Sequence, residues 1–171
     1  TLSLQSNDPS NGTVTVALNG AGAPPESPLV ISQILYDAAS PETAWEFIEI
    51  YNDSSETVSL AGYVVDDNNA MAHTAANIAG GSVGPFNVAY LYNAGAISSA
   101  EFRAAWGAVN AVAVTGWANL QLNNTGDRIG LWRSFAEYSG DHANHLLAIV
   151  DVQYTNAAPW PVNNAAGAIY L

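Results

Sequence analysis

The chain of 171 residues contains no cysteine and no lysine, and each absence removes a class of chemistry. Without cysteine there is no disulfide, no thiolate nucleophile and no thiolate metal ligand. The lack of lysine excludes amine nucleophiles and lysine bases. The three basic residues are all arginines and face 15 acidic residues, so the formal net charge is −12. Such a charge repels phosphate at long range and disfavours nucleic acid as a partner.

Several sequence signals are missing as well. No apolar run approaches the roughly 18 residues that a membrane-spanning helix needs. The chain starts at Thr1 without a basic segment followed by an apolar one, so we expect a processed or excised piece of a longer precursor. No Gly-x-Ser-x-Gly elbow occurs, and alternation places Glu46 and Glu49 on opposite faces of a strand, where they cannot pair as acid and base. We therefore predict that the chain is not an enzyme.

The sequence does contain a series of short runs with β-strand character, separated by turn residues. The densest run covers residues 45–52, where aromatic and β-branched side chains follow one another. Alternation places Ile48 and Ile50 on one face and Phe47 on the other, which predicts a central strand covered on both faces. Further strands are predicted at residues 29–36, 58–67, 78–83, 88–92, 109–114, 118–122, 128–132, 145–154 and 169–171. Such a series indicates an all-β sandwich or barrel.

One short helix is predicted near residues 98–106. Ser98 and Glu101 have the spacing of a capping box, in which each side chain bonds the backbone N–H of the other. Phe102 and Trp106 lie four residues apart and therefore share one helical face. Gly107 stands where a helix commonly ends.

Residues 1–22 precede the sandwich as two alternating runs joined by turn residues, which is a β-hairpin signal. Residues 23–28 contain three prolines and are expected to form a linker to the sandwich domain of residues 29–171. The pattern of residues 6–22 resembles the last hairpin of immunoglobulin-like repeats of the choice-of-anchor or ASH type, found in large secreted bacterial proteins. This resemblance implies that the hairpin has lost the rest of its domain and needs another partner.

A second resemblance covers most of the chain. It is carried by residues 29–36, 46–52, 58–63, 66–67, 122–131, 150–154, 160–161 and 167–171, which follow one another in family order. Residues 29–171 thereby resemble the lamin tail domain, known from lamin C-termini and from many secreted bacterial proteins. The resemblance implies an immunoglobulin-like β-sandwich without catalytic activity, in an extracellular or cell-surface location and of bacterial origin.

Asp66, Asp67 and Asn69 are the candidate metal ligands. Their carboxylate and amide oxygens are hard ligands of the kind that calcium prefers. The spacing differs from that of a twelve-residue EF-hand loop, and a polar turn between two strands is the stronger interpretation of the same residues. We predict no cofactor, unless calcium binds at these residues.

Two further groups have both a functional and a structural interpretation. Asp141, His142 and His145 offer two imidazoles and a carboxylate to zinc, but a solvated loop is the stronger interpretation, since four-coordinate sites need more ligands. Four tryptophans could stack on sugars or bases, but core packing is the stronger interpretation because aromatic residues dominate the cores of small domains. They are Trp106, Trp117, Trp132 and Trp160.

The N-terminal hairpin gives the main functional hypothesis. Thr13, Val14, Thr15, Val16 and Leu18 alternate as in a strand that adds to the open edge of another sheet. That sheet would belong to the same or an adjacent domain or to a neighbouring subunit, and head-to-tail addition between subunits builds a filament. The hypothesis is therefore an extracellular structural module, such as a filament or surface-layer component, although the hairpin also has the simpler explanation of a remnant. The alternative function is a ligand- or calcium-binding accessory domain of a larger secreted hydrolase or nuclease.

Overall fold

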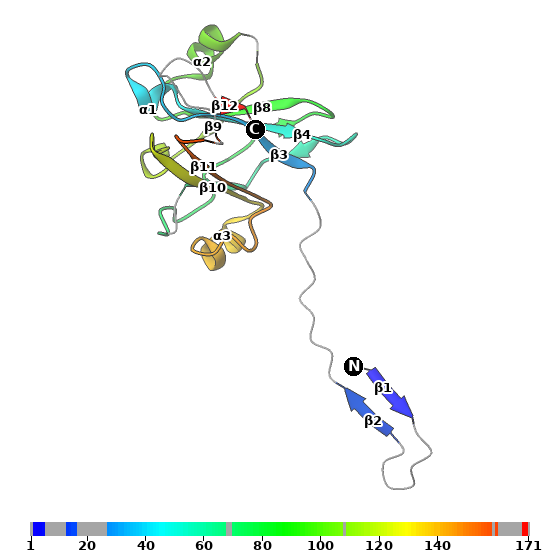
Figure 1. The fold of residues 1–171 in the computed structure, drawn as a ribbon. Coiled ribbons are helices and arrows are strands. Elements are labelled where there is room, and N and C mark those ends of the chain that lie inside the picture. The colour runs from blue at the N-terminus through cyan, green and yellow to red at the C-terminus, as the bar shows by residue number, and fades with distance from the viewer. Residues whose placement is uncertain are drawn as a thin grey trace.

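The computed structural model describes residues 2–5, 13–16, 27–67, 70–107, 109–158, 160 and 169–170. Two β-sheets face each other across a shared core (Figure 1). The five-stranded sheet has the order β12-β3-β4-β8-β9 and consists of β12 (Ile169–Tyr170), β3 (Leu29–Leu35), β4 (Phe47–Asn52), β8 (Val88–Asn93) and β9 (Ala111–Val114). The three-stranded sheet has the order β11-β10-β6 and consists of β11 (Val150–Thr155), β10 (Gly126–Trp132) and β6 (Val64–Asp66). The prediction of an all-β sandwich is confirmed.

Strand β4 is central, as predicted, and is covered on both faces. It pairs antiparallel with β3 on one side and with β8 on the other. Ile48 and Ile50 are buried between the two sheets, where they belong to the same core as Ile129 of β10. Phe47 belongs to a second cluster on the opposite face, where Phe102 covers it at a ring-centroid distance of 5.9 Å. The strand begins at Phe47, so the predicted start at Trp45 is wrong.

Among the described residues, three α-helices accompany the sheets. Helix α2 (Ser99–Trp106) confirms the predicted one, including the capping box between Ser98 and Glu101. Helices α1 (Glu42–Trp45) and α3 (Phe135–Asp141) were not predicted. Figure 1 shows α2 and α3 at opposite ends of the sandwich. Within the described residues, no helix is long and apolar enough to cross a membrane.

Several predicted strands differ from the structure. Residues 118–122 do not form one, because Gly116 has a left-handed φ of 70° and opens a 3-10 helix, η1 (Trp117–Asn119). Residues 78–83 form only the short strand β7 (Ser82–Val83) and a single bridge at Ile78, since Gly81 turns the chain with a φ of 103°. The strand predicted from residue 145 starts at Val150.

The predicted strand at residues 58–67 is interrupted at its glycine. It forms β5 (Val58–Ser59) and β6, separated by a turn in which Gly62 has a φ of 86°. Such a backbone conformation favours glycine, because a side chain would strain it. Strand β5 pairs with β7 in a small two-stranded sheet of its own.

The N-terminal strands form the predicted hairpin. Strand β1 (Leu2–Gln5) pairs antiparallel with β2 (Thr13–Val16), with Leu2 opposite Val16 and Gln5 opposite Thr13. These two strands form a separate two-stranded sheet and pair with no other described strand. Leu18 and residues 23–26 of the predicted linker lie outside the described residues.

Candidate functional site

A polar hollow of about 500 Å³ lies beside β10 and β11. It is lined by side chains and backbone from both strands and from two neighbouring loops, namely Asp67, Thr125, Gly126, Asp127, Arg128, Ala143, His145, Gln153, Tyr154 and Thr155. The hollow contains both acidic and basic groups, so we consider it the first candidate for a binding site.

Asp127 is held firmly in this hollow. Its carboxylate accepts hydrogen bonds from Asn123 N at 3.1 Å and from Arg128 N at 2.8 Å. Burial raises the pKa of Asp127 above its ordinary value, and the charge of Asp66 acts in the same direction. Hydrogen bonds, one of them with the side chain of Asp67, oppose this shift. Asp67 and Asp127 thus place two interacting acids at one wall of the hollow.

Arg128, Asp151 and His145 form a second polar group. The guanidinium of Arg128 binds Asp151 through two bonds, Nε to Oδ1 at 2.8 Å and Nη2 to Oδ2 at 2.6 Å. Nδ1 of His145 lies 3.1 Å from the same Oδ1. Burial lowers the pKa of His145, and the charge of Arg128 adds to this effect although Asp151 opposes it. A neutral imidazole would donate its Nδ1–H to Asp151, so the group is an internally satisfied polar wall.

The three predicted calcium ligands are not equivalent in the structure. Asp66 is fully buried and accepts a hydrogen bond from the hydroxyl of Tyr138 and another from Asp67 N at 3.0 Å. Nε2 of His73 lies 3.6 Å from Oδ1 of the Asp66 carboxylate. Asp67 lines the polar hollow, whereas Asn69 lies outside the described residues. Within the part of the chain that the structure describes, no three acidic, histidine or cysteine side chains are grouped to hold a metal ion.

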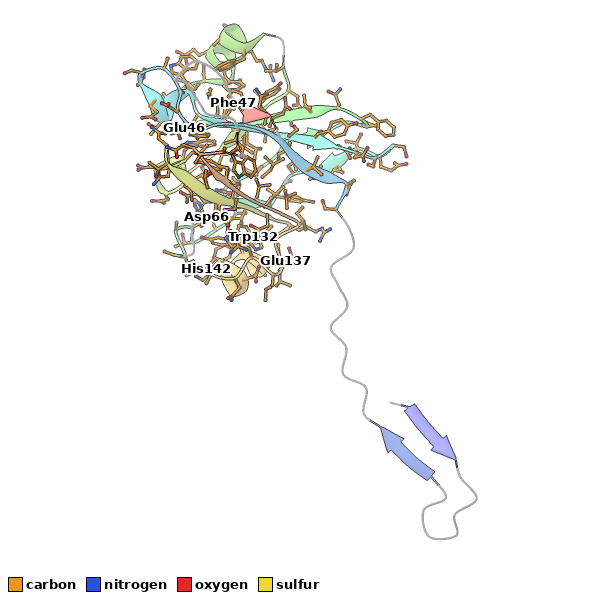
Figure 2. The ribbon with its side chains drawn as sticks, in the orientation of Figure 1. Glu46, Phe47, Asp66, Trp132, Glu137 and His142 are labelled. Atoms are coloured by element: carbon orange, nitrogen blue, oxygen red, sulfur yellow. The ribbon has the colours of Figure 1, made fainter. Side chains whose placement is uncertain are left out.

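The predicted zinc residues have different partners. Asp141 accepts hydrogen bonds from Trp132 Nε1 at 3.0 Å, Leu146 N at 2.8 Å and Leu147 N at 2.6 Å. His145 packs edge-on against Trp132 at a centroid distance of 4.7 Å, and His142 packs against Tyr138 at 5.7 Å. The segment is an ordered cap over β10 and not a solvated loop (Figure 2).

Glu46, which cannot pair with Glu49 as acid and base, is itself a buried acid. Its side chain lies at the end of α1, and the residue is 1% exposed (Figure 2). Burial raises the pKa of Glu46 to about 7, although the indole of Trp117 donates to its Oε2 at 2.8 Å. The charge of Glu42 raises the pKa further. Both acids line a second polar hollow, of about 260 Å³, together with Asn123 and Asn124.

The tryptophans fall into two groups. Trp117 and Trp132 are buried, and Trp160 packs against the main core, which agrees with the core interpretation for these three. Trp106 is 41% exposed. With Trp45 it lines an apolar hollow of about 210 Å³ between α2 and the segment that leads into α1. Trp106 is therefore the most exposed of the four predicted stacking residues.

The comparison with known protein families agrees with this architecture. Residues 22–151 match the model of the Lamin Tail Domain. No curated protein matches the chain. The family has an immunoglobulin-like fold and is generally non-enzymatic, which agrees with the two packed sheets described above. The match covers 130 of the 171 residues, and the chain therefore belongs to the lamin tail domain family.

Proposed function

We propose that the chain is a non-catalytic structural module that binds other protein through its N-terminal strands. The partner is an adjacent domain or a neighbouring subunit, and the place of action is the bacterial cell surface or the extracellular space. The membership of a generally non-enzymatic family supports this proposal. The net charge of −12 supports it further, because it keeps the module soluble and disfavours nucleic acid as the partner.

The observation that carries the proposal is the pairing of the hairpin. Strands β1 and β2 pair with each other and with no other described strand, so each has one edge without a described partner. A two-stranded hairpin is only marginally stable in water and gains stability when a further strand extends its sheet. The likeness of residues 6–22 to the last hairpin of a larger repeat supports the same proposal. Such a hairpin has lost the strands that extend its sheet, and a strand edge of another domain or subunit can replace them.

Deletion of residues 1–22 tests the proposal. We expect the remaining sandwich to fold, with an unfolding temperature close to that of the intact chain, because Leu29 is the first described residue of its core. We expect it to lose self-association in sedimentation velocity, because the pairing strands are gone. If the intact and the shortened chains sediment alike at every concentration and melt alike, the hairpin has no role in assembly.

Calcium binding by an accessory domain is the second candidate function, and Asp67 is the residue that favours it. Asp67 lines the polar hollow beside Asp127, whereas Asp66 is occupied by internal hydrogen bonds. If calcium binds there, calorimetry will show heat with the intact chain and none with an Asp67→Asn variant. An Asp53→Asn variant is the matched control, because Asp53 lines a different hollow beside Val30. Equal responses of all three proteins would remove calcium at Asp67 from the account.

A further inference from the structure

We infer that the outer edge of β11 is the acceptor edge for strand β2 of a second copy of the chain. This inference rests on the proposed function and adds to it the place where the partner strand binds. Adding a strand requires a sheet edge whose backbone N–H and C=O groups have no partner. Among the described residues, the two main sheets have four borders, formed by β6, β9, β3 with β12, and β11.

The β6 border is closed by a side chain. Asn77 Oδ1 accepts a hydrogen bond from Val65 N at 3.0 Å, and Asn77 Nδ2 donates to Val65 O at 2.8 Å. The buried amide thus imitates a neighbouring strand and uses both outward groups of the middle residue of β6.

The β9 border is closed by the segment of residues 77–82. Ile78 forms an antiparallel bridge with Val114, and Thr115 N donates to Asn77 O at 2.9 Å. Gly81 lies so close to the edge that an added Cβ would come within 2.9 Å of a Val112 methyl group. A further strand would have to displace this segment.

The β3 border is closed at both ends. Strand β12 pairs with Gln33 and Ile34, and Leu29 N donates to Ser27 Oγ at 3.1 Å. Only a short stretch around Ile31 remains between these contacts. The separate sheet of β5 and β7 offers strands of only two residues, too short for a ladder of hydrogen bonds.

On the outer side of β11, no described strand forms a ladder of hydrogen bonds. Because Val65 directs its backbone groups to Asn77, its partner Leu131 directs its own groups to β11. Leu131 is opposite Val150, so alternation turns the backbone groups of Asp151, Gln153 and Thr155 outward. No hydrogen bond between described residues uses these outward backbone groups.

The residues of β11 suit strand addition. Natural edge strands are commonly protected by lysine, proline or an unpaired charge. Strand β11 has neither lysine nor proline, and its one charged residue, Asp151, is neutralised by Arg128. Gln153 is exposed and uncharged. Each copy therefore carries a donor strand at its N-terminus and an acceptor at β11, and two different surfaces that bind each other build an open-ended chain of subunits.

Disulfide trapping between two single-cysteine variants tests the inference, because the chain contains no cysteine of its own. One protein carries Thr15→Cys in β2 and the other carries Gln153→Cys in β11. Neighbouring strands bring Cα atoms to about 4.5–5.5 Å, within the range that a disulfide spans. Ala113→Cys is the matched control, because Ala113 is exposed on β9, whose edge is closed. To allow for register, Val14→Cys and Val16→Cys are tested in parallel.

We expect mixed dimers between at least one β2 variant and Gln153→Cys, at least tenfold more abundant than with Ala113→Cys. If Gln153→Cys gives no mixed dimers, or no more than Ala113→Cys, while deletion of residues 1–22 still abolishes association, the β11 assignment is overturned and the proposed function stays intact. A further variant carries Thr15→Cys and Gln153→Cys in the same chain. If this variant forms the disulfide within one chain and the two single variants form none with each other, the second copy is overturned as the partner. If deletion of residues 1–22 leaves association unchanged, the proposed function fails and the inference fails with it.

Discussion

A Glu46→Gln variant is expected to gain stability relative to the natural chain as the pH rises from 4.5 to 8. The folded structure raises the pKa of Glu46 from 4.5 to about 7 because the carboxyl group is buried. The fold thus favours the protonated acid. Its contribution to stability is complete below pH 4.5, declines as the pH rises, and is lost above pH 7. A pKa shift of this size corresponds to a change of about 3 kcal/mol in the free energy of unfolding across this pH range.

Urea unfolding of both proteins at pH 4.5, 6 and 8 measures this change. Other acids titrate in the same range, so the informative quantity is the difference in the free energy of unfolding between the two proteins. A Glu42→Gln variant is the matched control. It removes the neighbouring charge that raises the pKa of Glu46 and leaves Glu46 buried. The pH range over which stability falls should therefore move slightly lower. Parallel pH profiles of the natural chain and Glu46→Gln would show that Glu46 is not held in its neutral form.

An Asp66→Ala variant is expected to lose about 1–3 kcal/mol of stability, because it removes the acceptor of a buried hydrogen bond. Asp66 is fully buried and accepts the hydroxyl hydrogen of Tyr138, which in turn accepts hydrogen bonds from Ala72 N at 2.9 Å and His73 N at 3.3 Å. Truncation leaves the Tyr138 hydroxyl without an acceptor and opens a small cavity in the polar core beneath α3. The loss should be the same with and without calcium.

A double-mutant cycle with Tyr138→Phe identifies the network as the cause. If Asp66 acts through Tyr138, the sum of the stability losses in the two single variants will exceed the loss in the double variant by about 1 kcal/mol or more. Asp67→Asn is the matched control, because Asp67 lines the hollow and its replacement leaves the Tyr138 bond intact. A loss below 1 kcal/mol for Asp66→Ala, or calcium stabilisation that disappears with it, would instead support a metal-ligand role for Asp66.

The parts of the fold that could be predicted from the sequence are those set by local pattern. Ile48 and Ile50 alternate with Phe47, and this alternation alone indicated a strand buried on both faces. The capping box of α2 depends on residues three positions apart. Helix α3 has a similar signal that could have been used, since Ser134 Oγ accepts a hydrogen bond from Glu137 N at 3.2 Å.

The polar networks could not be predicted, because they join residues that are distant in the sequence. Tyr138 and Asp66 are 72 positions apart, and Trp117 and Glu46 are 71 positions apart. Neither spacing nor residue type signals such a pair before the sheets are assembled. For this reason the sequence indicates only a polar turn or a candidate calcium ligand at Asp66, whereas its burial and its hydroxyl partner depend on how α3 packs over β6.

Assembly of the chain through its N-terminal strands is tested by the mass of the particles that the intact chain forms in solution. Light scattering over a dilution series measures this mass, and electron microscopy shows the shape of the particles. We expect particles that grow with concentration beyond the 17.8 kDa of one chain and that appear as rods, because strand addition between different surfaces does not form a closed ring. Compact particles with the mass of a single chain at every concentration would contradict it.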